Sequence, residues 1–255
     1  MALTGNQTES RDFLPLLKWM IFTGVVLFCF WMAWRFGLVQ LMLESDKSYI
    51  SFAVIIIYAL TSIHCLFQVI VMSREIGRAH RTRTQIMRGA NDFRVEGDQV
   101  YTGNGEALLP GRLTAHIRNL VLKARNQADK QVDQTLLLRG LADSLKAPVN
   151  LGTYAADSVL KLGLLGTIVG FILMLVPIAG LDSFDAASMK SSMKLMGDGM
   201  AVAMYTTLAG LIGSILIKAQ YYILDDSCAY FFCLTTNLTE VFVVSTLARP
   251  EHGRV

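Results

Sequence analysis

The sequence is poor in charged residues and in cysteine. Charged side chains make up 17% of its 255 residues, whereas about 25% is usual in soluble domains. The four cysteines, Cys29, Cys65, Cys228 and Cys233, form no CxxC pair, so the sequence predicts neither a disulfide framework nor a zinc site. The HExxH and GxSxG motifs of hydrolases are also missing. These absences argue against a soluble domain and against an enzyme.

Apolar residues are abundant instead, at 53% of the chain, and they gather in four long runs. The runs cover residues 14–38, 49–72, 162–180 and 199–224. A membrane-spanning helix needs about 20 predominantly apolar residues, so each run predicts one span. We therefore expect an all-α integral membrane protein with four transmembrane helices. Lys218, near the end of the fourth run, is expected to snorkel toward the lipid headgroups.

The predicted spans divide the chain into four parts. Residues 1–72 hold an N-terminal tail and the first two spans, and residues 73–161 form a water-facing helical loop. Residues 162–224 hold the last two spans, and residues 225–255 form an amphipathic tail.

The loop is expected to be a helical hairpin. Turn-forming glycine, asparagine and proline gather in residues 97–111. Residues 112–146 are predicted to form one helix, because their apolar side chains recur every three or four positions. His80 and His116 have no second ligand at metal spacing, so we expect solvated imidazoles there and no metal site.

Basic residues set the predicted orientation. Five arginines follow the second run closely: Arg74, Arg78, Arg81, Arg83 and Arg88. Cations close to a span mark the cytoplasmic side, so the loop and both termini are expected in the cytoplasm. These arginines also suit contact with anionic lipid. Because the positive charge gathers in this loop, the sequence does not predict nucleic-acid binding.

Small residues and hydroxyls form stripes on the third and fourth runs. Glycines spaced for close helix packing flank the hydroxyl of Thr167 on the third run, and the fourth run repeats the pattern around Thr207, with Thr206 beside it. The residues expected to pack helices are Gly163, Gly166, Gly170, Ala203, Gly210 and Ser214, and the hydroxyls expected to line an ion pathway are Thr167, Thr207 and Thr206.

Two explanations of these hydroxyls stay open. Threonine in a membrane helix often bonds back to a carbonyl of its own helix and does no more. Alternatively, hydroxyls repeated around an oligomer supply the polar lining of an ion pathway. Neither stripe contains Asp or Glu, so an ionisable group in that pathway would come from another chain.

The segments 162–177 and 199–211 resemble the third and fourth spans of the MotA/TolQ/ExbB proton-channel family. The order of two spans, a large loop and two further spans resembles its four-span MotA branch. By resemblance, Thr167 and Thr207 match the pore threonines of the third and fourth spans, and Thr206 matches a threonine of the sodium-type stators.

The resemblance implies a bacterial inner-membrane protein that forms a homopentamer around a single-span MotB/TolR/ExbD-like partner carrying an essential aspartate. H⁺ or Na⁺ is then the transported ion, no cofactor is needed, and ion flow drives a motor or energiser. The alternative is a structural four-span scaffold that conducts no ions.

Overall fold

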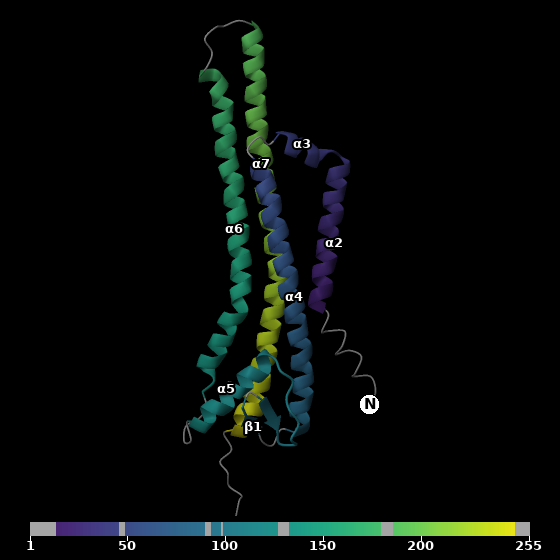
Figure 1. The fold of residues 1–255 in the computed structure, drawn as a ribbon, viewed down its shortest axis with the longest axis vertical. Helices are drawn as coiled ribbons and strands as arrows, with labels where there is room; N and C mark the ends of the chain where they lie inside the picture. Colours follow the sequence, from purple (N-terminus) through teal and green to yellow (C-terminus); the bar gives the residue numbers. More distant parts are fainter. Residues whose placement is uncertain are drawn as a thin grey trace, which may run out of the picture. The chain divides into compact units, whose positions relative to one another are not determined.

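The computed structural model describes residues 14–45, 49–89, 93–97, 99–126, 133–179 and 186–247. Nearly all of them are helical (Figure 1). Four helices are long and apolar enough to cross a membrane: Leu14–Arg35, Ile50–Arg88, Thr135–Val176 and Met189–Val244. The prediction of four membrane-spanning helices is therefore confirmed by length and composition.

The elements follow one another along the chain with no long connection between most of them. They are α2 (Leu14–Arg35), α3 (Leu38–Ser45), α4 (Ile50–Gly89), β1 (Phe93–Glu96), β2 (Gln99–Thr102), α5 (Arg112–Asn126), α6 (Thr135–Ala179), α7 (Ala186–Leu238), the π-helical turn η1 (Thr239–Val244) and α8 (Ser245–Leu247). Helix α7 thus begins well before residue 199, where the fourth apolar run starts.

Strands β1 and β2 form an antiparallel hairpin that the sequence analysis did not predict. Phe93 pairs with Thr102, and Val95 pairs with Val100. Gly97 follows β1 with a φ of 63°, a conformation that glycine adopts without steric cost. Each strand has only four residues, too few for their alternation to stand out. The fold of the described residues is all-α apart from this hairpin, so the loop that was expected to be helical contains two strands as well as helices.

The single helix predicted over residues 112–146 is also wrong, because α5 and α6 are separate helices. Asp133 ends the break: its carboxylate accepts the backbone N–H of Thr135, the first residue of α6, at 2.9 Å. An acidic side chain in this position caps a helix N-terminus, and the bonds from Thr135 hold the pKa of Asp133 below its usual value. Apolar periodicity continues across the break, so the pattern alone did not reveal it.

The described residues fall into two compact units. Of the described residues, those within 14–17, 68–148 and 223–247 belong to unit 1, and those within 18–67 and 149–222 belong to unit 2. Helices α4, α6 and α7 each contribute residues to both units.

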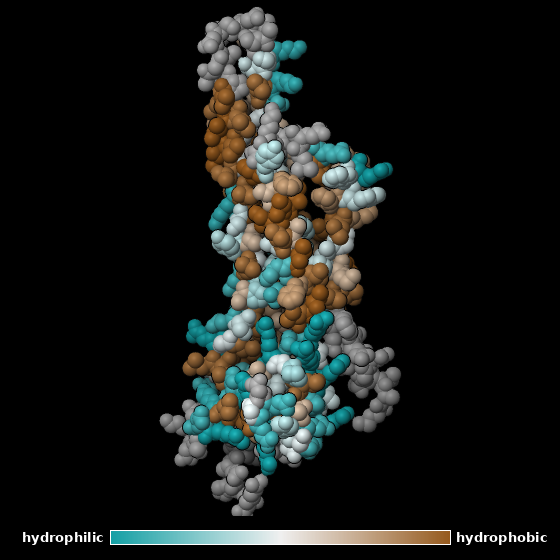
Figure 2. Space-filling model, in the orientation of Figure 1, coloured by the Kyte–Doolittle hydropathy of each residue, from teal (hydrophilic) through white to brown (hydrophobic). Residues whose placement is uncertain are grey.

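Unit 1 has an apolar core of its own. Side chains from α4, α5 and α7 are at most 1% exposed there, among them Ile76, Ile117 and Phe231. The C-terminal part of α7 buries Cys228, Phe231 and Leu238, whose successive spacings of three and seven residues place them on one face of an amphipathic helix. Figure 2 shows hydrophilic residues over much of the visible surface around α5 and the hairpin.

Unit 2 exposes apolar side chains to its surroundings. Along α2 only Trp19 is buried, and large apolar residues of α6 such as Ile168 and Phe171 are more than half exposed. Figure 2 shows apolar residues over the visible faces of α2 and of the C-terminal half of α6. A surface of this kind suits lipid or protein contact rather than water.

Candidate functional site: the paired faces of α6 and α7

In unit 2, α6 and α7 approach until their backbones touch. A Cβ atom added to Gly163 would lie 2.9 Å from the Cα of Gly210, and one added to Gly170 would lie 2.6 Å from the backbone nitrogen of Ala203. Real Cβ atoms do not come this close to backbone atoms. The structure therefore brings together four of the residues that the sequence singled out for helix packing.

Gly166 and Ser214 complete that set. The α-carbon of Gly166 faces the side chain of Thr206, so that any Cβ at residue 166 would collide with it. Ser214 is 4% exposed. Sequence reasoning missed two further close approaches, at Gly199 against the backbone of Met174 and at Gly152 against the ring of Tyr221. The signal was present, because Gly199 lies four residues before Ala203 and extends the same stripe.

The three threonines occupy different environments. Thr206 is fully buried in the contact between α6 and α7, whereas Thr167 and Thr207 are partly exposed. Each hydroxyl donates to a carbonyl of its own helix: Thr206 to Val202 at 2.8 Å, Thr207 to Ala203 at 2.8 Å and Thr167 to Leu164 at 2.5 Å. The hydroxyl oxygens of Thr167 and Thr207 keep acceptor capacity, since a hydroxyl donates one bond and accepts two.

An open groove of about 410 Å³ lies beside Thr167. Its walls are Ile168, Phe171 and Met174 of α6 together with Met200 and Ala203 of α7. Thr167 is the only polar side chain among these lining residues. A cation or a neutralised carboxylate in this groove would find the Thr167 hydroxyl as its nearest side-chain polar group.

Polar side chains also link α4 to α7 within unit 2. The Nδ1 atom of His64 lies 2.8 Å from the hydroxyl of Tyr221, which donates to the carbonyl of Thr61 at 3.3 Å. The side-chain amide of Gln220 donates to Tyr58 and Ser62. These contacts hold α7 to α4, so His64 is engaged with a neighbouring helix.

Lys218 has a partner on a neighbouring helix. Its ammonium group forms an ion pair with Asp157 of α6 at 2.9 Å, and both side chains are about half exposed. The sequence did not predict this partner, and the expectation that Lys218 snorkels toward the headgroups stays a prediction.

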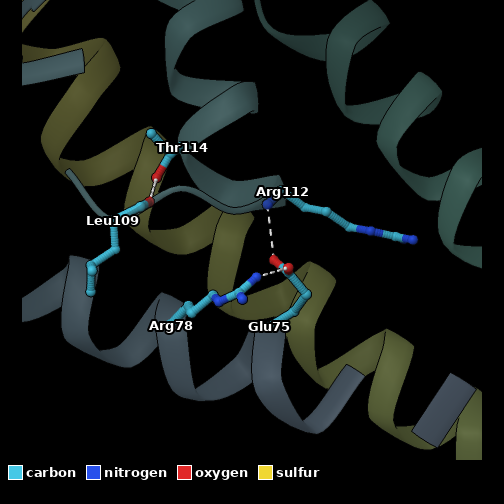
Figure 3. A network of polar contacts seen from close by, with 5 residues as sticks. All are labelled: Glu75, Arg78, Leu109, Arg112 and Thr114. Carbon is cyan, nitrogen blue, oxygen red and sulfur yellow. Dashed lines mark hydrogen bonds and ion pairs between the residues drawn. The ribbon is translucent and has the colours of Figure 1, made fainter. Parts of the chain in front are cut away.

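Unit 1 contains a buried carboxylate at the start of α5. Glu75 of α4 accepts the backbone N–H of Arg112 at 2.9 Å and pairs with Arg78 at 2.9 Å (Figure 3). The Thr114 hydroxyl donates to the Leu109 carbonyl at 2.6 Å. A negative charge at a helix N-terminus is favourable, so Glu75 fixes the start of α5 against α4.

The prediction of a solvated His116 is wrong. His116 is 5% exposed, because it lies on the apolar face of α5 beside Ile117 and Leu120. Its ring bonds the side chain of Gln134, which in turn accepts the hydroxyl of Thr239 at 3.0 Å and donates to Glu240. Burial lowers the pKa of His116 below its usual 6.5.

We expect His116 to make unit 1 sensitive to acid. The unfolded chain takes up a proton at this position as the pH falls through 6.5, whereas the folded chain resists it. Stability is therefore present above that pH and is lost as the pH falls toward the folded pKa, at a rate of at most about 1.4 kcal/mol per pH unit.

Hydrogen exchange of the α5 amides checks this expectation. Lowering the pH below 6.5 should increase the opening of α5. His116→Gln should make this opening less dependent on pH. His80→Gln is the matched control, since His80 lies on α4 and is only partly buried. Equal pH dependence with and without His116 would contradict the assignment.

The described residues contain few other groups that could form a functional site. Among the parts of the chain that the structure describes, no three His, Cys, Asp or Glu side chains gather as a metal site would require. Cys29, Cys65, Cys228 and Cys233 are free thiols. The features that stand out are therefore the paired faces of α6 and α7.

These features define a class: a helical multi-span membrane protein with two long, closely packed helices and a hydroxyl-bearing groove. Residues 117–229, from the middle of α5 to the C-terminal part of α7, match the model of the MotA/TolQ/ExbB proton channel family. The match covers a little under half of the 255 residues, and it confirms the resemblance seen in the sequence. No curated protein and no solved structure matches the chain.

The family match supports an ion-driven membrane energiser in general terms. Together with the four apolar helices, it indicates a multi-pass protein of the inner membrane. Members of this family generally work with a single-span partner of the MotB/TolR/ExbD kind.

Proposed function

We propose that this chain is the multi-copy subunit of an ion-driven motor or energiser. Several copies, a pentamer by resemblance, form a ring around a single-span partner whose span carries an aspartate. H⁺ or Na⁺ binds that carboxylate, which passes the Thr167 and Thr207 hydroxyls as the ring moves relative to the partner. Both termini and the loop 73–161 lie in the cytoplasm.

The observation that carries the proposal is the exposure of two hydroxyls beside a backbone-to-backbone helix contact. The glycine contacts fix α6 against α7, so Thr167 and Thr207 are held on rigid helices. The groove beside Thr167 is otherwise apolar, and it leaves room for side chains of a neighbouring helix, a carboxylate among them. In a ring, each copy would repeat this groove once.

Thr206 has a different place in this proposal. It is 0% exposed and lies beneath Gly166. We assign it to packing of α6 on α7, and we restrict the ion pathway to Thr167 and Thr207.

The membrane supplies the energy for movement. One elementary charge that crosses about 100 mV releases roughly 2.3 kcal/mol. Several ions per cycle can therefore drive mechanical work on an envelope or cytoplasmic target.

Ion flux through the purified complex tests the proposal. The complex is extracted with its co-purifying chains, reconstituted in liposomes and exposed to an imposed membrane potential, while entrapped dyes report protons and sodium. The proposed function predicts uptake of one of these ions above protein-free liposomes. Absence of uptake of either ion would favour the alternative, a structural four-span scaffold.

A further inference from the structure

Asp157 is a carboxylate on the same side of α6 as the groove. It precedes Ile168, which lines the groove, by eleven residues. At 3.6 residues per turn this is about three turns, or roughly 16 Å along the helix. Within α6 from residue 149 and α7 up to residue 222, the described acidic residues are Asp157 and Asp198. Asp198 lies on the side of α7 opposite Met200 by the same helical count.

Lys218 is placed in the same way on α7. It follows Met200, another groove residue, by eighteen residues, which is five complete turns, so the two side chains lie on one side of α7. The Asp157–Lys218 ion pair of 2.9 Å therefore joins the groove-bearing faces of the two helices, beyond the threonines.

The ion pair is not needed to hold α6 and α7 together. The small-residue contacts at Gly163 and Gly170 already bring the backbones into touch. A pair with about half of each side chain exposed contributes little to stability, because water screens it. The position of this ion pair, on the faces of α6 and α7 that bear the groove, therefore needs an explanation other than stability.

We propose that Asp157 is the acceptor for the ion that leaves the groove, with Lys218 as its displaceable counter-ion. This inference rests on the proposed function. A proton that passes Thr167 and Thr207 binds the Asp157 carboxylate, and Lys218, still protonated, moves into water. When the proton leaves to the aqueous side, the pair forms again. For Na⁺ the same carboxylate coordinates the ion in place of the lysine.

Lys161 takes part in the same arrangement. It lies one turn farther along α6 and acts electrostatically on the same carboxylate. Asp157 thus faces two ammonium groups, and an arriving ion competes with both. The ion is consequently held only briefly, as a pathway requires.

Three variants separate an acceptor from a structural ion pair. Asp157→Asn removes the carboxylate, Lys218→Met removes the counter-ion, and the double variant removes both charges without leaving either one unpaired. Each is co-expressed with the partner, and proton and sodium uptake are measured in inverted and right-side-out membrane vesicles under an imposed potential. Asp143→Asn, on an exposed part of α6, is the matched control.

If Asp157 is the acceptor, Asp157→Asn and Lys218→Met should have different effects on ion uptake. Uptake should fall about a hundredfold or more in Asp157→Asn and in the double variant, the low end of what a positioned proton-transfer group contributes. Lys218→Met removes an ammonium group that competes with the ion for Asp157 and should raise uptake, whereas Asp143→Asn should keep the wild-type uptake. Equal losses in the two single variants with recovery in the double variant would show a structural pair and overturn the inference, as would unchanged uptake in Asp157→Asn.

Failure of the proposed function gives a different pattern. Wild-type complex that takes up neither protons nor sodium would overturn the proposed function and this inference together. Wild-type uptake with the symmetric variant pattern would overturn this inference alone. Intact complex size, measured for every variant, distinguishes loss of the pathway from loss of assembly; the double variant carries the test if Asp157→Asn does not assemble.

Discussion

Replacing both Thr167 and Thr207 by valine is expected to lower ion uptake about tenfold or more, because each lost hydrogen-bonding partner in an apolar site costs about 1–3 kcal/mol. Valine has nearly the shape of threonine, so the packing of α6 on α7 is kept. Both hydroxyls are partly exposed and already bond their own helices, and only their acceptor capacity is removed from the pathway. Uptake per assembled complex is the measurement.

Thr61→Val and Thr206→Val are the controls for this result. Thr61 also lies in an apolar helix and bonds back to the carbonyl of Ile57 at 2.7 Å, but it is on α4. Thr206 is buried against Gly166. Both variants should conduct like the wild type. Equal losses from all these threonines would show that the hydroxyls act locally in their helices and that no pathway runs past Thr167.

Gly170→Ala is expected to destabilise the contact between α6 and α7 by about 1–3 kcal/mol, the usual cost of overpacking. The added methyl group would lie 2.6 Å from the backbone nitrogen of Ala203 and 2.8 Å from its Cα atom. Backbone atoms of two long helices cannot move aside as a flexible side chain can, so the helices must separate. Thermal unfolding in detergent and the yield of assembled complex are the two readouts.

Gly140→Ala is the matched control on the same helix. A Cβ at residue 140 meets nothing within 4 Å, and alanine is favoured over glycine in a helix interior by roughly 0.5–1 kcal/mol. This variant should be neutral or more stable. If both alanine variants stabilised the protein alike, the close contact at Gly170 would be refuted.

The membrane helices were predictable because their signal is long and cumulative. Each apolar run extends over about 20 or more residues, and the glycine spacing at Gly163, Gly166 and Gly170 showed which face of the third run would pack. On the fourth run, Ala203 and Gly210 showed equally well which face would pack against these glycines.

Other features were out of reach of the sequence patterns. Asp157 and Lys218 are 61 residues apart in sequence, and nothing in either neighbourhood predicts the other. The burial of His116 followed from the core of unit 1, and the hairpin from two strands of four residues each. The separate places of Thr206 and Thr207 also required the structure, since adjacent residues point about 100° apart around a helix.

The most direct test of the central claim is the intact mass and composition of the complex extracted from its native membrane in mild detergent. The account predicts a ring, by resemblance a pentamer, of the 28.2 kDa chain, together with a small single-span protein that has an aspartate within its span. Recovery of a monomer or dimer without such a partner, persisting when lipid-preserving extraction is used, would contradict the account and favour a scaffold.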